Sequence, residues 1–136
     1  MTTPYHSGYW PPFPTLPIVL QVEDLRLGPF TALLDTGADI TLITTDLLEQ
    51  VGAAESGPAK VRSHFGERLP AQLYLVGIQV QKIVLPGVYV IGDDVGKEML
   101  LGRDVLNKLA LFLDGPAQQT DVLDDATVNR LRARRG

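Results

Sequence analysis

The chain has 136 residues, of which 45% are hydrophobic and 21% charged, and its formal net charge is −4 at pH 7. This length and composition are ordinary for one folded globular domain, and they exclude a wholly disordered chain, a collagen and a disulfide-linked scaffold. Cysteine is absent, which excludes a thiolate metal site and a cysteine nucleophile.

The basic residues are distributed unevenly, with four arginines close to the C-terminus in residues 130–135. The rest of the chain is strongly acidic and would repel a phosphate backbone, so we expect no nucleic-acid partner, and we interpret the arginines as part of a solvated terminus. No stretch approaches the roughly 20 apolar residues that span a bilayer, and the first residues lack the basic region of a signal peptide. We therefore expect a cytoplasmic protein that does not bind membranes.

Residues 1–17 contain five of the ten prolines, together with Tyr5, Tyr9, Trp10 and Phe13. Because proline fixes φ and removes a hydrogen-bond donor, this segment is predicted to be an extended arm rather than a helix or a central strand. Its aromatic side chains favour contact with an apolar surface, either on the same domain or on a partner. A loose, exposed arm is the alternative.

Strands are predicted from the point where the arm ends. Apolar residues alternate with others over residues 18–22, which is the pattern of a half-buried strand. Gly28-Pro29 predicts a turn, and residues 30–34 predict a second strand that pairs back on the first. After a short interruption, residues 40–43 continue as a strand.

The middle of the chain predicts one short helix and a long hairpin. The helix is expected at residues 44–50, with Thr44 as its cap and Gly52 at its end. Residues 53–60 resemble a loop. The hairpin is expected over residues 61–80, with its turn near residues 64–67.

The last third predicts further short elements. Two strands at residues 83–85 and 88–91 are separated by Pro86-Gly87, a short helix covers residues 103–109, and a final strand lies at residues 111–113. The whole pattern predicts a mainly β domain that closes on itself, with one or two short helices. We divide the chain into an N-terminal arm (1–16), a central domain (17–120) and a C-terminal tail that is helical or disordered (121–136).

The segment Leu33-Leu-Asp-Thr-Gly-Ala-Asp-Ile-Thr-Leu-Ile43 carries the clearest chemical signal. It places a carboxylate in a turn between two apolar strand segments, and Gly37 permits a tight backbone path there. Burial raises the pKa of a carboxyl group, and a second carboxylate nearby separates the two pKa values. One group can then take a proton from water while the other donates one. From the residues alone, an ordinary turn is the commoner interpretation.

The same string resembles the active-site segment of the retroviral and retroviral-like aspartic proteases, the retropepsin family. A second string, Leu100-Leu-Gly-Arg-Asp-Val-Leu106, is similar to the family's apolar-apolar-Gly-Arg segment, which begins its single helix. The predicted hairpin between them lies where the family has its flap. The resemblance covers residues 17–115 and implies a single-domain acid-protease fold that functions as a homodimer.

The resemblance also implies roles for individual residues. Asp35 would be the catalytic aspartate, and Thr36 would hydrogen-bond across the dimer axis. Gly37 would let the backbone approach the substrate. Ala38 and Asp39 would line the cleft, with their backbone groups paired to the peptide.

Further roles follow for the second motif and for the flap. Arg103, with Gly102 before it, would be structural and would pair with Asp39, although an ordinary surface arginine is the alternative. Three residues at the predicted flap tip would contact substrate: His64, Phe65 and Gly66. For His64 a solvated loop residue is the alternative. Glycine is scarcer in this tip than is common in the family, and about twenty residues follow the matched region.

The chain contains one Asp-Thr-Gly, whereas the chemistry requires two aspartates that share a proton. A twofold homodimer would supply the second aspartate by symmetry. The resemblance therefore implies an aspartic endopeptidase that hydrolyses a peptide bond by water attack. No metal, cofactor or covalent intermediate is implied, and the substrate would lie extended beneath two flaps.

Two other functions remain open at this point. A retropepsin-fold dimer could bind peptides or serve as a scaffold without hydrolysis, although binding alone does not require an intact Asp-Thr-Gly. The chain could also be a structural dimerisation module of a larger assembly, with the aromatic arm as its docking element.

Overall fold

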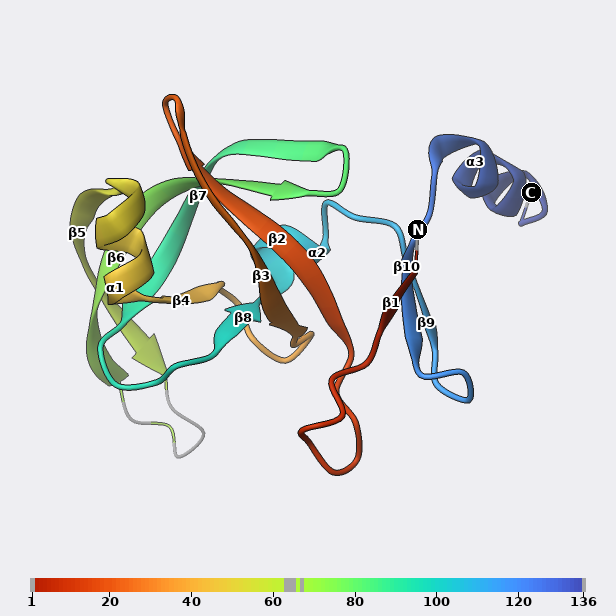
Figure 1. Ribbon diagram of the computed structural model, residues 1–136, viewed down its shortest axis with the longest axis horizontal. Coiled ribbons are helices and arrows are strands. Elements are labelled where there is room, and N and C mark those ends of the chain that lie inside the picture. The colour runs from red at the N-terminus through yellow and green to blue at the C-terminus, as the bar shows by residue number, and fades with distance from the viewer. Residues whose placement is uncertain (1, 63–65, 67, 136) are drawn as a thin grey trace.

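In the computed structural model, which describes residues 2–62, 66 and 68–135, the chain folds mainly into β-strands (Figure 1). The strands are β1 (Thr2–Pro4), β2 (Thr15–Val22), β3 (Leu25–Leu34), β4 (Leu42–Thr44), β5 (Ala54–Arg62), β6 (Arg68–Val80), β7 (Ile83–Asp93), β8 (Met99–Leu101), β9 (Leu111–Asp114) and β10 (Gln119–Val122). The helices among these residues are α1 (Thr45–Val51), α2 (Arg103–Leu106) and α3 (Asp125–Ala133).

Six strands form a closed barrel. The larger sheet has the order β2-β3-β8-β4-β7-β6-β5, and an additional antiparallel pairing of β2 with β6 closes the ring of the first six strands. Strand β5 lies outside this ring as an extra partner of β6. Closure removes the open sheet edges that would otherwise pair with other chains. The predicted mainly β domain that closes on itself is confirmed.

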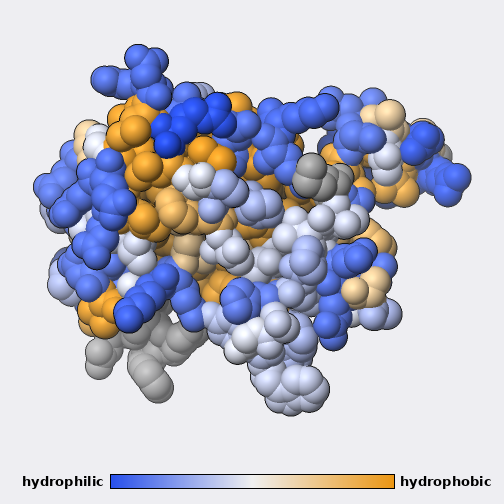
Figure 2. Space-filling model, in the orientation of Figure 1, coloured by the Kyte–Doolittle hydropathy of each residue, from blue (hydrophilic) through white to orange (hydrophobic). Residues whose placement is uncertain are grey.

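The barrel interior is filled by aliphatic side chains from most of its strands. Alternate residues of β2 point inward, as the sequence pattern predicts, because side chains alternate between the two faces of a strand. The largest side chains that are fully buried are Leu16, Ile18, Leu20, Ile43, Leu48, Val51, Val76, Ile78, Val80, Val90, Leu101 and Val105. Figure 2 shows that further apolar surface remains near the tip of the β2–β3 hairpin.

The predicted turn at Gly28-Pro29 is wrong. Both residues lie inside β3, and the chain turns instead at residues 23–24. The pairing register of β2 with β3 shifts at Val19, which therefore faces two residues instead of one. This arrangement is a β-bulge, where a proline without an N–H group does not break the ladder.

The predicted break at Pro86-Gly87 is wrong for the same reason. Strand β7 runs continuously through both residues, so the two expected strands are one. The register of β6 with β7 shifts at Gly77, which lies opposite the Pro-Gly pair. A Cβ atom at position 77 would lie 2.8 Å from the carbonyl oxygen of Gln21, so glycine allows β2, β6 and β7 to meet there.

Three other boundaries differ from the predictions. Residues 53–60 are not a loop, because β5 begins at Ala54 and pairs along β6, with a bulge near Gly57. The second helix is shorter than expected and ends at Leu106. Strand β9 is not the last strand, since the chain returns as β10. Helix α1 lies where it was predicted and ends at Gly52 in the left-handed conformation, but the Thr44 side chain makes no capping hydrogen bond.

Strands from near the two ends of the described chain pair in a small second sheet, which has the order β1-β10-β9. Within the proline-rich segment, residues 2–4 thus form an edge strand, β1, and residues 5–14 form no helix, whereas residues 15–17 already belong to the barrel strand β2. Helix α3 follows β10 and extends away from the barrel (Figure 1), and none of its residues is buried. Its cap is Asp124, whose carboxylate accepts the Thr127 N–H at 2.8 Å, and this bond lowers the pKa of Asp124.

No helix within the described residues is both long enough and apolar enough to cross a membrane.

We predict that Leu20→Ala lowers the free energy of unfolding by about 2–5 kcal/mol, because the leucine is fully buried in the barrel and its removal leaves a cavity. The matched control is Leu25→Ala on the adjacent strand, where 46% of the side chain is exposed. Its effect should stay within about 0.5 kcal/mol. Urea denaturation measures both, and equal losses would contradict this description of the core.

Candidate active site

Asp35 lies where β3 leaves the barrel. Strands β3 and β8 are parallel and end together, with Leu34 paired to Leu101. Just beyond this pair, the Asp35 N–H donates to the Leu101 carbonyl oxygen at 3.0 Å. The two sequence motifs are therefore neighbours in space, because each follows one strand of the same parallel pair.

The carboxylate of Asp35 stabilises the loop that begins at this residue. The Gly37 N–H donates to Asp35 Oδ1 at 2.8 Å, and the Ala38 N–H donates to the Asp35 carbonyl oxygen at 3.2 Å. An aspartate that accepts a hydrogen bond from the backbone two residues later stabilises a tight turn. Asp35 is half-buried, whereas Thr36 and Gly37 are exposed. The turn thus presents its carboxyl group at the surface of the chain.

The start of α2 lies directly against this loop. The Arg103 N–H donates to the Ala38 carbonyl oxygen at 2.8 Å, and the Asp104 N–H donates to the Asp39 carbonyl oxygen at 3.3 Å. A Cβ atom on Gly102 would lie 2.7–3.0 Å from backbone atoms of residues 38 and 40. No real side chain fits at that distance, so Gly102 makes the close approach possible.

Arg103 also reaches the loop with its side chain. Its guanidinium forms an ion pair with the Asp39 carboxylate, and its Nη1 donates to the Thr36 carbonyl oxygen at 2.8 Å. The two side chains are 45% and 80% exposed, so the ion pair itself adds at most about 1 kcal/mol of stability. The bond to Thr36 matters more for the site, because it fixes the backbone next to Asp35.

The sequence analysis missed a third link, between Thr41 and Asp104. The Thr41 hydroxyl donates to Asp104 Oδ1 at 2.7 Å and accepts the Gly102 N–H at 3.1 Å. The Thr41 N–H donates to Asp104 Oδ2 at 3.1 Å. Thr41 is fully buried and Asp104 is half-buried, so this small network lies mostly inside the chain. Two features of the sequence could have indicated this link: a threonine within an apolar segment, Thr41, and an aspartate directly after Gly-Arg, Asp104.

The other predicted site residues are placed unequally. Ala38 is half-buried and Asp39 exposed, both within the loop. Gly66 is exposed in a bend between β5 and β6, with φ at +84°. His64 and Phe65 lie outside the described residues. The β5–β6 hairpin, which corresponds to the predicted flap, lies to one side of the Asp35 loop in Figure 1.

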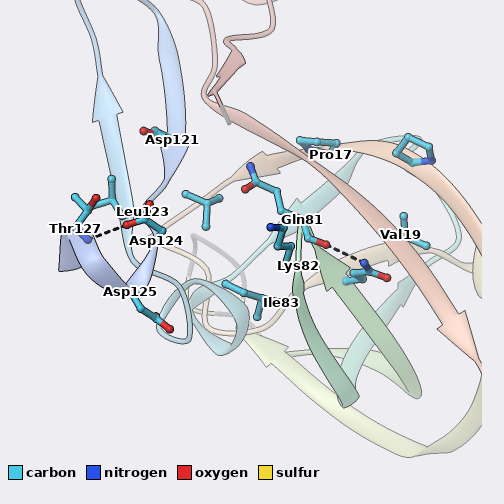
Figure 3. A pocket seen from close by; sticks show the side chains of 13 residues that line it. Pro17, Val19, Gln81, Lys82, Ile83, Asp121, Leu123, Asp124, Asp125 and Thr127 are labelled. Atoms are coloured by element: carbon cyan, nitrogen blue, oxygen red, sulfur yellow. Dashed lines mark hydrogen bonds between the residues drawn. The ribbon is translucent and has the colours of Figure 1, made fainter. Parts of the chain in front are cut away.

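A cavity of about 970 Å³ lies elsewhere in the chain, between β2, the β6–β7 turn and the segment that joins β10 to α3 (Figure 3). Lys82, Asp124 and Thr127 are among the residues around it, and no residue of the Asp35 loop or of α2 lines it. The Asp35 surface is therefore separate from this cavity. One chain presents its aspartate on an open face.

The comparisons with known proteins agree with this geometry. A family model described as gag-polyprotein putative aspartyl protease matches residues 25–108, which include both motifs. No curated protein matches the chain.

Two solved structures are similar in fold. The EIAV protease in complex with the inhibitor HBY-793 is 22% identical, with a TM-score of 0.53 over 71% of this chain and 86% of that one. A retropepsin-like aspartic protease from Rickettsia conorii is 12% identical, with a TM-score of 0.58 over 91% of this chain and 92% of that one. At these identities the likeness concerns the fold.

We predict that Thr41→Val lowers the free energy of unfolding by about 1–3 kcal/mol, because it leaves the buried Gly102 N–H without its acceptor and removes the hydroxyl bond to Asp104 Oδ1. Thr41→Ser keeps the hydroxyl and loses only a methyl group, so it should cost less. Thermal and urea unfolding compare the two variants. Equal losses would show that packing, rather than the hydrogen bonds, stabilises the link.

Proposed function

The chain belongs to the gag-polyprotein putative aspartyl protease family, and from this we propose that it is an aspartic endopeptidase that acts as a homodimer. The observation that carries the proposal is the Asp35 loop. Its carboxyl group lies at the surface, while the backbone around it is fixed from three directions, by β8, by α2 and by the Arg103 side chain. A carboxyl group that is both fixed and open suits catalysis, because reacting groups must be held in a defined geometry.

A second copy of the chain would complete the site. The sequence contains one Asp-Thr-Gly, and aspartic proteolysis requires two carboxyls that share one proton. Thr36 and Gly37 are exposed beside Asp35, so a twofold axis next to the loop would bring two such loops together. In this arrangement Thr36 would hydrogen-bond to the partner's loop.

The proposed reaction uses a water molecule between the two carboxyls. The ionised carboxylate takes a proton from the water, whose oxygen attacks the carbon of the scissile amide. The protonated carboxyl donates its proton to the carbonyl oxygen, which gives a tetrahedral diol. As the diol collapses and the C–N bond breaks, the carboxyl that took the proton from water passes it to the leaving nitrogen, and a hydroxyl of the diol gives its proton to the other carboxylate. The pair of carboxyls is thereby returned to its starting state with one shared proton.

The substrate we propose is an extended peptide between the Asp35 loops and the two β5–β6 hairpins. An extended chain binds by backbone hydrogen bonds, in the manner of an added strand. The carbonyl oxygens of Ala38 and Asp39 already accept N–H groups of α2, and the Ala38 N–H donates within the loop. The Asp39 N–H is therefore our candidate donor to the peptide. His64, Phe65 and Gly66 remain candidate contacts from the hairpin.

We assign catalysis to the central domain, residues 17–120, which contains the Asp35 loop and α2. The arm, residues 1–16, and the tail, residues 121–136, lie outside this catalytic unit. A cytoplasmic location remains a proposal from the sequence.

We predict that Asp35→Asn lowers the rate of peptide cleavage by about 10²–10⁴-fold or more, the range that general acid–base catalysis supplies. The test is cleavage of a mixed peptide library between about pH 4 and pH 7, detected by mass spectrometry. The wild-type and Asp35→Asn chains are compared at equal concentration. Asp24→Asn is the matched control, since it makes the same chemical change in the exposed β2–β3 turn. Cuts that persist in Asp35→Asn would exclude Asp35 as the catalytic group. If no chain cuts any peptide, the binding or scaffolding dimer becomes the better proposal.

We also predict that Asp35→Asn chains inhibit the wild-type chain. In an equimolar mixture with free exchange, about half of the wild-type chains should pair with a variant and lose activity, because such a pair has one aspartate. The initial cleavage rate after mixing measures this effect, with Asp24→Asn as the partner in the control mixture. A rate that does not change with added Asp35→Asn would mean that one chain acts alone.

A further inference from the structure

The chain between β1 and β2, residues 5–14, forms a closed loop that we call the aromatic loop. His6 and Phe13 exchange two backbone hydrogen bonds across it, at 2.8 and 3.1 Å. The Tyr9 ring packs against both of them, with ring centroids 5.4 Å from His6 and 5.4 Å from Phe13. The loop also contains Pro11 and Pro12, which restrict its backbone. It is thus largely pre-organised, which lowers the entropy cost of any contact that it makes.

Trp10 lies in this loop and is 94% exposed. It is also the only tryptophan of the chain. An indole is a large apolar group that gains free energy when it is buried, and tryptophan is enriched among the residues that dominate protein interfaces. An ordered loop that holds a tryptophan in water is therefore suited to contact another surface.

The aromatic loop is attached to the frame of the candidate active site. At its end, the Pro14 carbonyl oxygen accepts the N–H of Leu34, the residue before Asp35. On its other side, the Tyr9 hydroxyl donates to the carboxylate of Glu98, the residue before β8. The hydrogen bond to this carboxylate raises the pKa of Tyr9.

The direction of the loop follows from the strand register. Strands β2 and β3 are antiparallel, with Thr15 paired to Leu33. The chain before Thr15 therefore continues in the direction in which β3 runs into Asp35. Figure 1 agrees, because the aromatic loop and the loop after β3 both project to the lower edge of the view. A partner that faces Asp35 meets the aromatic loop as well.

We propose that the aromatic loop is a clamp of the homodimer, in which Trp10 packs against a second copy of this chain. The proposal rests on the proposed function, which requires a second copy at the Asp35 face. Apolar side chains that could receive it are present on β9, an outer strand of the small sheet, where Phe112 is 53% exposed on one face and Leu113 is 47% exposed on the other. The turn that follows β9 lies towards the same lower edge of Figure 1.

The fluorescence of Trp10 tests the clamp directly, because no other tryptophan contributes to it. Indole emission moves to shorter wavelength when the ring leaves water. We expect the emission to shift in this direction as the protein concentration rises, in parallel with dimer formation in sedimentation velocity. The Asp35→Asn chain should show the same shift, so the measurement does not depend on catalysis.

Two variants make the test quantitative. Trp10→Ala should raise the dissociation constant of the dimer at least about tenfold, as expected for an interface residue of this kind. It should not change the unfolding of the monomer, since the side chain is exposed there. The matched control is Leu25→Ala, which removes an exposed apolar side chain at the opposite end of the β2–β3 hairpin and should leave the dissociation constant unchanged.

Four results would overturn the clamp. If the chain dimerises without an emission shift, or if Trp10→Ala dimerises like the wild type, the clamp is wrong while dimeric proteolysis stands. If the emission shifts only when a cleavable peptide is added, Trp10 contacts substrate instead. If the chain stays monomeric at every concentration, both the clamp and the dimeric mechanism fail. Peptide cuts that Asp35→Asn abolishes would then still identify the catalytic group.

Discussion

The Asp35 loop approaches the start of α2 so closely that position 102 has room for glycine alone. This approach joins two segments that are more than sixty residues apart in the chain. Backbone hydrogen bonds to residues 38 and 39, the Arg103 side chain and the buried Thr41–Asp104 pair all lie across the same contact. Because several bonds act together, the loop cannot shift without breaking most of them. The surface position of the Asp35 carboxyl follows from this constraint.

The barrel makes this contact possible. Parallel strands need a long connection between them, and here β3 and β8 are joined through four other strands and α1. The closing pair of β2 with β6 fixes β2, and β2 in turn positions β3 from the other side. The same strand orients the aromatic loop that precedes it. One strand pair therefore sets the place of both the carboxyl group and Trp10, although the two belong to different loops.

The short motifs of the candidate site could be recognised in the sequence, whereas the Thr41–Asp104 link between them could not. Asp-Thr-Gly and Gly-Arg are short strings with a recognisable pattern, whereas the Thr41–Asp104 bond joins side chains 63 residues apart and needs the folded barrel. The two Gly/Pro pairs show the same limit. Turns and bulges favour the same residue types, and the difference lies in the partner strand, where Val19 or Gly77 faces two residues. The local sequence does not determine which residues of the partner strand lie opposite.

Within the described residues, Asp35 lies half-buried at the surface of a single chain. In the mechanism that we propose, a second chain would supply the other carboxyl and exclude bulk solvent. The cavity near α3 does not serve this purpose, since none of its lining residues comes from the Asp35 loop. The aromatic loop, by contrast, is bonded to Leu34, the residue before Asp35, and to Glu98, the residue before β8. If a second chain covers the Asp35 face, the same movement that builds the cleft also removes Trp10 from water. Catalytic assembly and burial of the most exposed aromatic side chain are then one event, which couples the stability of the dimer to the formation of the site.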